Sequence, residues 1–103
     1  MGYCIILTTC PDRREADMLA CELVNRRLAA CVQTSPVTSC YYWDGSACRE
    51  TEIKLAIKTK TDLYRSVEKF ILEHHSYEVP QIIQIPVTDG SQKYLDWIDA
   101  NTI

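Results

Sequence analysis

The stretch Tyr41-Tyr42-Trp43-Asp44-Gly45 (YYWDG) joins two long strand-like segments and decides the fold. Asp-Gly between two such segments is a strong signal for a two-residue β-hairpin turn. After the turn, residues 52–58 alternate between polar and apolar side chains, as in a strand with one buried face. Before it, residues 31–43 are polar and rich in β-branched side chains. The sequence therefore predicts one long hairpin over residues 31–59.

Helix-like and strand-like segments flank the hairpin on both sides. Residues 3–8 form a short apolar run typical of a buried strand, and residues 16–28 carry apolar side chains at helical spacing. Asp12, with Glu15 three residues later, resembles a capping box at the start of that helix. The remaining predicted elements are a second helix, a fourth strand and a third helix, over residues 63–71, 82–87 and 94–98. The order β-α-β-β-α-β is that of an α+β, ferredoxin-like split-βαβ sandwich, here with an added C-terminal helix.

Length and composition indicate a single globular domain over residues 1–103. The chain has 47% hydrophobic and 24% charged residues, with no linker, repeat or low-complexity stretch. Its net charge is −3, with no cluster of Lys and Arg. Because phosphate contacts dominate nucleic-acid affinity, we expect no nucleic-acid partner. Anionic membrane surfaces are disfavoured for the same reason.

No segment has the length or composition of a membrane anchor or an export signal. The longest early apolar run is Cys4-Ile5-Ile6-Leu7, whereas a spanning helix needs roughly 20 apolar residues. No Lys or Arg precedes this run, as a signal peptide would require. The expectation is a soluble, cytoplasmic protein.

Six cysteines could form a disulfide framework, a metal cage or free thiols. A framework is disfavoured because the chain shows no export signal and has only three glycines and four prolines. A preformed zinc or iron–sulfur cage is disfavoured because no C-x-x-C occurs. We expect mostly free thiols in the core or at the surface. Cys10 is the exception to watch, because it precedes Pro11 at a helix start.

The hairpin is too long for a lone compact domain. Arms of about twelve residues each span roughly 40 Å, whereas a domain of this size has a radius of gyration of only about 13 Å. A projecting tip that carries Tyr41, Tyr42 and Trp43 needs a partner, and a second copy of the chain is the simplest one. The alternative is a bulge at Pro36 that breaks the strand into two short pieces.

His74 and His75 form the only histidine pair. Adjacent helical positions point about 100° apart, so both side chains would not bind one ion in the simplest geometry. Two readings remain open: one histidine caps the end of the second helix, or one is a metal ligand.

Several motifs, taken together and in order, resemble the CutA family of divalent-cation tolerance proteins. They are Cys10-Pro11-Asp12, Leu28-Ala29-Ala30-Cys31-Val32, Tyr41-Tyr42-Trp43-Asp44-Gly45, Glu52 to Lys60, His74-His75-Ser76-Tyr77-Glu78-Val79-Pro80 and Tyr94-Leu95-Asp96-Trp97. The resemblance covers nearly the whole chain. It implies a ferredoxin-like protomer in a PII-like homotrimer, whose long hairpins pair between subunits.

The resemblance also implies a copper site built from a Cys, a His and a Glu. The His falls on His74, but the Cys and Glu positions are Thr8 and Gln81 in this chain. Cys10 lies two residues beyond Thr8, and period two keeps it on the same face if the strand continues. Cys10 and His74 are therefore the candidate metal ligands, for copper or another divalent cation.

Three functions compete on this reading. The first is a non-enzymatic, trimeric divalent-cation tolerance protein that binds metal. The second is a PII-like signalling or scaffold trimer that binds a small ligand between subunits, which rests on fold similarity alone. The third is an acylphosphatase-like enzyme with Arg13 and Arg14 beside a helix start as an anion site, but these arginines are better explained as a solvated helix face.

Overall fold

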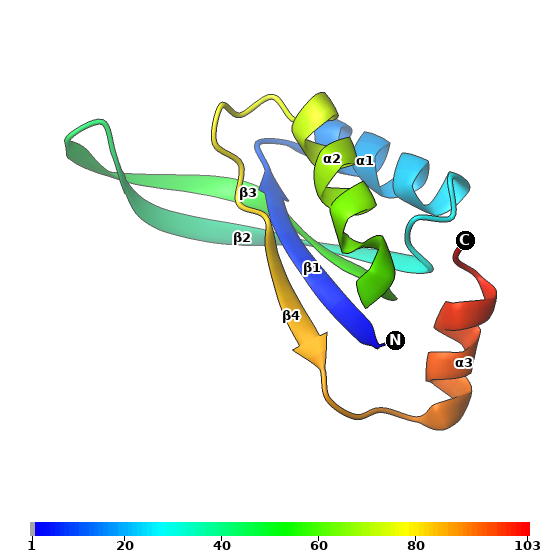
Figure 1. Ribbon diagram of the computed structural model, residues 1–103. Coiled ribbons are helices and arrows are strands. Elements are labelled where there is room, and N and C mark those ends of the chain that lie inside the picture. The colour runs from blue at the N-terminus through cyan, green and yellow to red at the C-terminus, as the bar shows by residue number, and fades with distance from the viewer. Residues whose placement is uncertain (1) are drawn as a thin grey trace.

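The computed structural model describes residues 2–103 and has the predicted order of elements (Figure 1). A single 3-10 turn (Thr61–Leu63) separates the third strand from the second helix. The main elements are β1 (Tyr3–Cys10), α1 (Arg13–Asn25), β2 (Cys31–Trp43), β3 (Ser46–Lys60), α2 (Tyr64–His74), β4 (Ile83–Val87) and α3 (Gln92–Ala100). The α+β fold class and the ferredoxin-like connectivity are confirmed.

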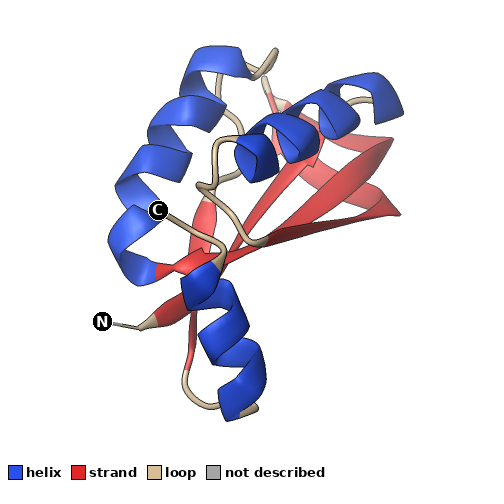
Figure 2. Cartoon of the chain, turned by 90° about the vertical axis from the view of Figure 1, so that its right-hand side faces the viewer, coloured by secondary structure: helices blue, strands red, loops and turns tan. Residues whose placement is uncertain are grey.

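The four strands form one antiparallel sheet in the order β2-β3-β1-β4. Both α1 and α2 cover the same face of this sheet, and α3 lies at the end opposite the hairpin tip (Figures 1 and 2). Alternate side chains of β1 enter the layer beneath the helices, because successive residues of a strand point to opposite faces. The core beneath the helices contains, among others, Cys4, Ile6, Cys10, Leu19, Leu23, Leu55, Ile57, Val67 and Ile71.

The hairpin of β2 and β3 is continuous from base to tip. Its register runs without interruption from Cys31 opposite Lys58 to Trp43 opposite Ser46. Asp44 and Gly45 have φ angles of 50° and 80°, as a two-residue turn with two positive φ values requires. Pro36 pairs with Ile53 and makes no bulge. A proline fits here because β2 is an edge strand, which has one side without a ladder partner.

The hairpin projects beyond the body of the domain (Figure 1). The molecule measures 45 × 25 × 21 Å, so it is nearly twice as long as it is wide. Tyr42 and Trp43 at the tip are 75% and 50% exposed. The projection inferred from arm length is thus present in the protomer.

Each helix within residues 2–103 is too short or too polar to cross a bilayer.

Candidate metal centre

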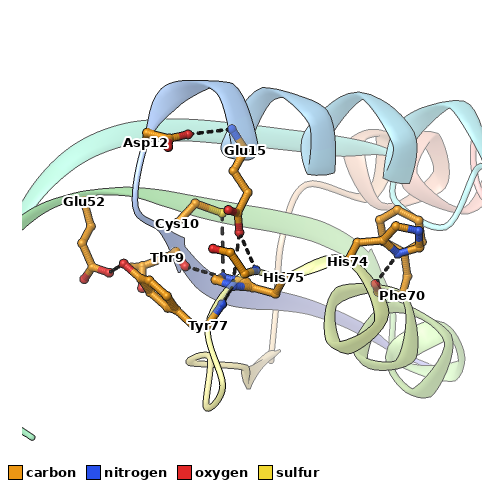
Figure 3. Close-up of polar contacts among 10 residues, drawn as sticks. Thr9, Cys10, Asp12, Glu15, Glu52, Phe70, His74, His75 and Tyr77 are labelled. Atoms are coloured by element: carbon orange, nitrogen blue, oxygen red, sulfur yellow. Dashed lines mark hydrogen bonds and ion pairs between the residues drawn. The ribbon is translucent and has the colours of Figure 1, made fainter.

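Three metal-ligating side chains meet where β1 ends and α1 begins. Cys10, Glu15 and His75 each offer one ligand atom, and these atoms all lie within 4.8 Å of one another. We call these three residues the Cys10 cluster; Figure 3 shows them converging from β1, α1 and the end of α2. The Sγ of Cys10 lies 3.9 Å from Nε2 of His75. The Nδ1 of His75 lies 3.2 Å from Oε2 of Glu15.

Local backbone structure brings these side chains together. Asp12 is the N-cap of α1, and its carboxylate accepts a hydrogen bond from the Glu15 backbone N–H at 2.9 Å. Half of the predicted capping box is therefore present. The Glu15 side chain does not complete it, because its Oε2 accepts the Ser76 N–H at 3.1 Å instead. The same carboxylate thus holds the loop that follows α2.

The end of α2 sends its two histidines to different places. His74 is the last helical residue, whereas His75 has an extended backbone with φ −83° and ψ 141°. The backbone N–H of His75 still donates to the carbonyl of Ile71 at 2.8 Å, which fixes the point of departure from the helix. The His75 side chain then turns inward and is fully buried.

The hydrogen bonds of His75 define its tautomer. Its Nδ1 accepts the Tyr77 backbone N–H at 3.0 Å, so Nδ1 carries a lone pair. Its Nε2 lies 2.7 Å from the Thr9 carbonyl oxygen, which can only accept, so Nε2 carries the proton. The neutral ring is thus held by one backbone donor and one backbone acceptor. Any ion that binds the ring must displace one of these contacts.

The Cys10 thiol lies in an environment that opposes its ionisation. The residue is fully buried, and burial raises the pKa of its thiol to about 12, with the carboxylates of Glu15, Asp12 and Glu52 adding to the rise. Burial and negative charges both disfavour a thiolate. The same carboxylates favour a cation. The thiol is therefore protonated in the metal-free protein, and a cation that binds it must displace the proton.

The cluster fits a divalent cation by charge and by ligand type. A thiolate, a carboxylate and a neutral imidazole carry two negative charges in total, which balance one dication. Ligand atoms around a tetrahedral zinc lie about 3.3–3.6 Å apart, given bond lengths of about 2.0–2.3 Å. The 3.9 Å separation joins Sγ of Cys10 to Nε2 of His75, and the 3.2 Å separation joins Oε2 of Glu15 to Nδ1. One ion binds one ring nitrogen, so either the thiol or the carboxylate must shift to complete the site. Thiolate and imidazole ligands are typical of copper and zinc sites.

The structure does not bring His74 to Cys10. The Nδ1 of His74 contacts the Phe70 carbonyl oxygen at 2.8 Å, and its ring stacks on Phe70 with centroids 4.2 Å apart. His74 thus contacts a carbonyl four residues back on its own helix. The histidine that faces Cys10 is its neighbour, His75.

The other two positions implied by the family resemblance, Thr8 and Gln81, are not members of the Cys10 cluster. Thr8 is fully buried on the helix-facing side of β1, and its Oγ1 has no hydrogen-bond partner within residues 2–103. Gln81 is exposed and lines a groove beside the hairpin. Among the described residues, no hydrogen bond joins any two of Thr8, His74 and Gln81.

Sequence reasoning missed Glu15 and His75 as members of the site. Glu15 was explained by helix capping, which accounts for its spacing from Asp12 but not for its side chain. One signal could have pointed to His75. The first residue after the last turn of a helix directs its side chain away from the side of the helix on which the preceding residue lies. The choice between His74 and His75 depended on the residue at which α2 stops.

A groove of about 860 Å³ lies between the hairpin arm and the loop that follows α2. We call it the hairpin groove. Three carboxylates line it, those of Glu50, Glu52 and Glu78, and the lining contains no Lys or Arg. Its remaining lining residues are Thr9, Thr38, Ser39, Cys40, Tyr41, Trp43, Tyr77, Val79, Pro80 and Gln81.

Tyr77 lines the hairpin groove. Its hydroxyl donates to Oε2 of Glu52 at 2.6 Å, and Glu52 is only 7% exposed (Figure 3). Burial, the hydrogen bond to Glu52 and the negative charges nearby raise the pKa of the Tyr77 hydroxyl. Tyr77 is therefore a neutral donor that satisfies a buried carboxylate.

Comparison with known proteins places the whole chain in one family. The model of the CutA1 divalent ion tolerance protein family matches residues 4–101. A divalent-cation tolerance protein CutA from Yersinia pestis is 38% identical over 100 residues, covering 96% of this chain and 84% of that protein. CutA1 structures from Shewanella sp. SIB1 and Oryza sativa superpose with TM-scores of 0.94 and 0.97, at 40% and 31% identity. The first pair covers 98% of this chain and 95% of the other, and the second covers 100% and 95%. The chain belongs to the CutA1 family of divalent ion tolerance proteins.

Proposed function

We propose that this protein binds a divalent cation through Cys10, Glu15 and His75, and that it does so as a non-enzymatic homotrimer. The observation that carries the proposal is the convergence of one thiol, one carboxylate and one imidazole within 4.8 Å. Family membership supports it, because the relatives are divalent-cation tolerance proteins. The proposal keeps Cys10 from the sequence-based ligand pair and replaces His74 by His75.

Copper is the first ion we propose, with zinc as the second. A thiolate is a soft ligand and imidazole suits both metals, whereas magnesium and calcium prefer sites made of oxygen atoms. Binding would release the Cys10 proton and neutralise the charge of Glu15. Because the thiol pKa is raised to about 12, we expect the affinity to increase as the pH rises.

The state of Cys10 argues against a nucleophilic enzyme. Cysteine, histidine and a carboxylate in series resemble the arrangement that activates a thiol for attack. A catalytic cysteine needs a lowered pKa and access to substrate, however. Cys10 has a raised thiol pKa and no exposed surface, so the same three residues favour a closed binding site.

The proposed trimer rests on the hairpin. Its tip exposes Tyr41, Tyr42 and Trp43, and β2 is an edge strand along all thirteen of its residues. Long exposed edges and aromatic patches on one chain are usually covered by another. Pairing of hairpins between copies would cover both.

The experiment that tests the cation site is native mass spectrometry of the reduced protein during copper titration. It reports subunit number and bound ions together. We expect three chains and one ion per chain, with uptake lost in Cys10→Ser and in His75→Ala. His74→Ala is the matched control, because it removes an adjacent imidazole that contacts Phe70 instead of the cluster.

Each outcome of this titration has a distinct meaning. Loss of uptake in His74→Ala, with uptake kept in His75→Ala, would restore the pairing of Cys10 with His74. Uptake that survives all three substitutions would reject both sites. A monomer in the spectrum would reject the trimer. The number of copper ions bound per monomer would then decide whether the cation site exists.

A second candidate function is a PII-like scaffold that binds a small ligand between subunits. The observation in its favour is the hairpin groove, whose volume of about 860 Å³ lies within the usual range for small-molecule sites. A thermal-shift screen of amines, nucleotides and small acids would test it. A raised melting temperature with one of these compounds supports this candidate. A screen in which no compound changes the melting temperature counts against it.

A further inference from the structure

One short loop joins the Cys10 cluster to the hairpin groove. It runs from the end of α2 at His74 to the start of β4 at Ile83. Its first residues contact the cluster: the Ser76 N–H donates to Glu15, and the Tyr77 N–H donates to His75. Its middle residues, from Tyr77 onwards, line the groove.

Tyr77 contacts both regions at once. Its backbone N–H donates to Nδ1 of His75 at 3.0 Å, and its hydroxyl donates to Glu52 at 2.6 Å. Its ring also lies 4.9 Å from the His75 ring, between centroids. Figure 3 shows Tyr77 between the cluster and Glu52. A change at His75 therefore acts directly on a residue that lines the groove.

Cation binding at His75 removes the acceptor of the Tyr77 N–H whichever ring nitrogen is used. If Nδ1 binds the ion, its lone pair is no longer available to the amide. If Nε2 binds the ion beside Cys10, the ring proton must leave Nε2. It then sits on Nδ1, where Glu15 at 3.2 Å can accept it, as carboxylates commonly do for metal-bound histidines. In both cases the hydrogen bond between the Tyr77 amide and Nδ1 is lost.

The half-buried backbone N–H of Tyr77 then lacks its acceptor, which is costly. Moving the loop relieves this cost, because the amide can reach water. That movement carries the Tyr77 hydroxyl away from Glu52. The Glu52 carboxylate, which is 7% exposed in the present arrangement, then faces the groove without its donor.

We propose that the Cys10 cluster and the hairpin groove are coupled through Tyr77, so that cation binding frees the Glu52 carboxylate for a groove ligand that carries an ammonium or guanidinium group. The ligand class follows from the lining, which carries three carboxylates and no Lys or Arg. The coupling rests on the cation site proposed above. It is reciprocal, because an occupied groove must change the ion affinity by the same factor.

The first test follows individual amides of the wild-type protein by hydrogen exchange in NMR spectra, with and without Zn²⁺. Zn²⁺ is the probe because it does not oxidise thiols. We expect exchange of the Tyr77 amide to speed up on binding. The His75 amide should stay protected, because its acceptor is the Ile71 carbonyl at 2.8 Å and not a ligand atom.

The second test compares Zn²⁺ affinity by calorimetry in wild type, Tyr77→Phe and Tyr42→Phe. Tyr77→Phe keeps the ring and the amide but removes the bond to Glu52 that must break, so we expect Zn²⁺ to bind about tenfold more tightly. Tyr42→Phe is the matched control: it removes a hydroxyl that donates to the Gly45 carbonyl at the hairpin turn, and the affinity should not change.

The outcomes separate the coupling from the cation site. If wild-type protein takes up no Zn²⁺ and no copper, the cation site and the coupling both fail. If Zn²⁺ binds with equal affinity to wild type and Tyr77→Phe, and the Tyr77 amide stays protected, the coupling alone fails. If the amide opens and Zn²⁺ binding tightens, a titration with agmatine, which carries both a guanidinium and an ammonium group, decides the ligand class. Agmatine that binds equally with and without Zn²⁺, or in neither case, would overturn the release of Glu52 to a groove ligand.

Discussion

The Cys10 cluster and the hairpin tip are opposite kinds of region within one small domain. In the cluster, His75 is fully buried and both of its ring nitrogens have backbone partners. At the tip, Tyr42 and Trp43 are 75% and 50% exposed. The cluster is complete within one chain, whereas the tip is an apolar surface that a partner could cover. The comparison teaches that buried polar contacts and exposed apolar surface are carried by different residues.

The largest effect is expected from substitutions that disrupt the hairpin tip and leave the Cys10 cluster intact. The double change Tyr42→Asp and Trp43→Asp places two charges on the proposed contact surface, so we expect the trimer to dissociate completely into monomers. Light scattering coupled to size-exclusion chromatography measures this. Leu72→Asp on α2 is the control, because Leu72 is similarly exposed at 56% but lies far from the tip along the chain. A double variant that stays trimeric would remove the tip from the interface.

The second largest effect is expected from a substitution that disrupts the Cys10 cluster and leaves the hairpin tip intact. His75→Ala removes a buried ring and leaves the Tyr77 amide and the Thr9 carbonyl without partners, so we expect a loss of about 2–4 kcal/mol in the free energy of unfolding. Urea unfolding at fixed protein concentration measures it, since assembly makes stability concentration-dependent. His74→Ala should cost about 1 kcal/mol or less. Equal losses in both variants would contradict the distinct places of the two histidines.

The third effect sharpens the comparison through pH. The folded state keeps the Cys10 proton up to about pH 12, whereas the unfolded chain loses it near the ordinary pKa of 9.0. Between these values the unfolded state binds fewer protons, so stability falls as the pH rises, with a slope of at most about 1.4 kcal/mol per pH unit. Unfolding of wild type and Cys10→Ala from pH 8 to 11 measures the difference in slope. Parallel curves would show that burial of the thiol does not shift its ionisation.

The smallest effect concerns the turn at the hairpin tip. Gly45 has φ +80°, and a Cβ added there would meet no atom within 4 Å. Gly45→Ala therefore tests backbone strain alone, at a cost of about 1–2 kcal/mol in the free energy of unfolding. Asp44→Gly, at φ 50°, should raise the free energy of unfolding or leave it unchanged. Thermal unfolding of both variants decides between them. A stabilised Gly45→Ala would mean that the turn does not hold this conformation.

Much of the fold could be predicted because it depends on local patterns. The alternation after Gly45 placed β3, the Asp-Gly pair placed the turn, and Asp12 placed the start of α1. The site could be predicted only in part. The position before Pro11 singles out Cys10, but the sequence pairs it with His74 and explains Glu15 as a helix cap.

The sequence alone determined the order of elements and the long hairpin, because backbone preference and side-chain period act over a few neighbouring residues. The family followed from a different signal, the resemblance of several motifs in order along the chain. Only the tertiary structure decided which histidine faces Cys10. His75 and Cys10 are 65 positions apart, and their contact depends on where α2 stops and how it packs on β1. The hydrogen bond between Tyr77 and Glu52, 25 positions apart, could not be predicted for the same reason. Contacts of this kind depend on the packing of whole elements, which no short stretch of sequence records.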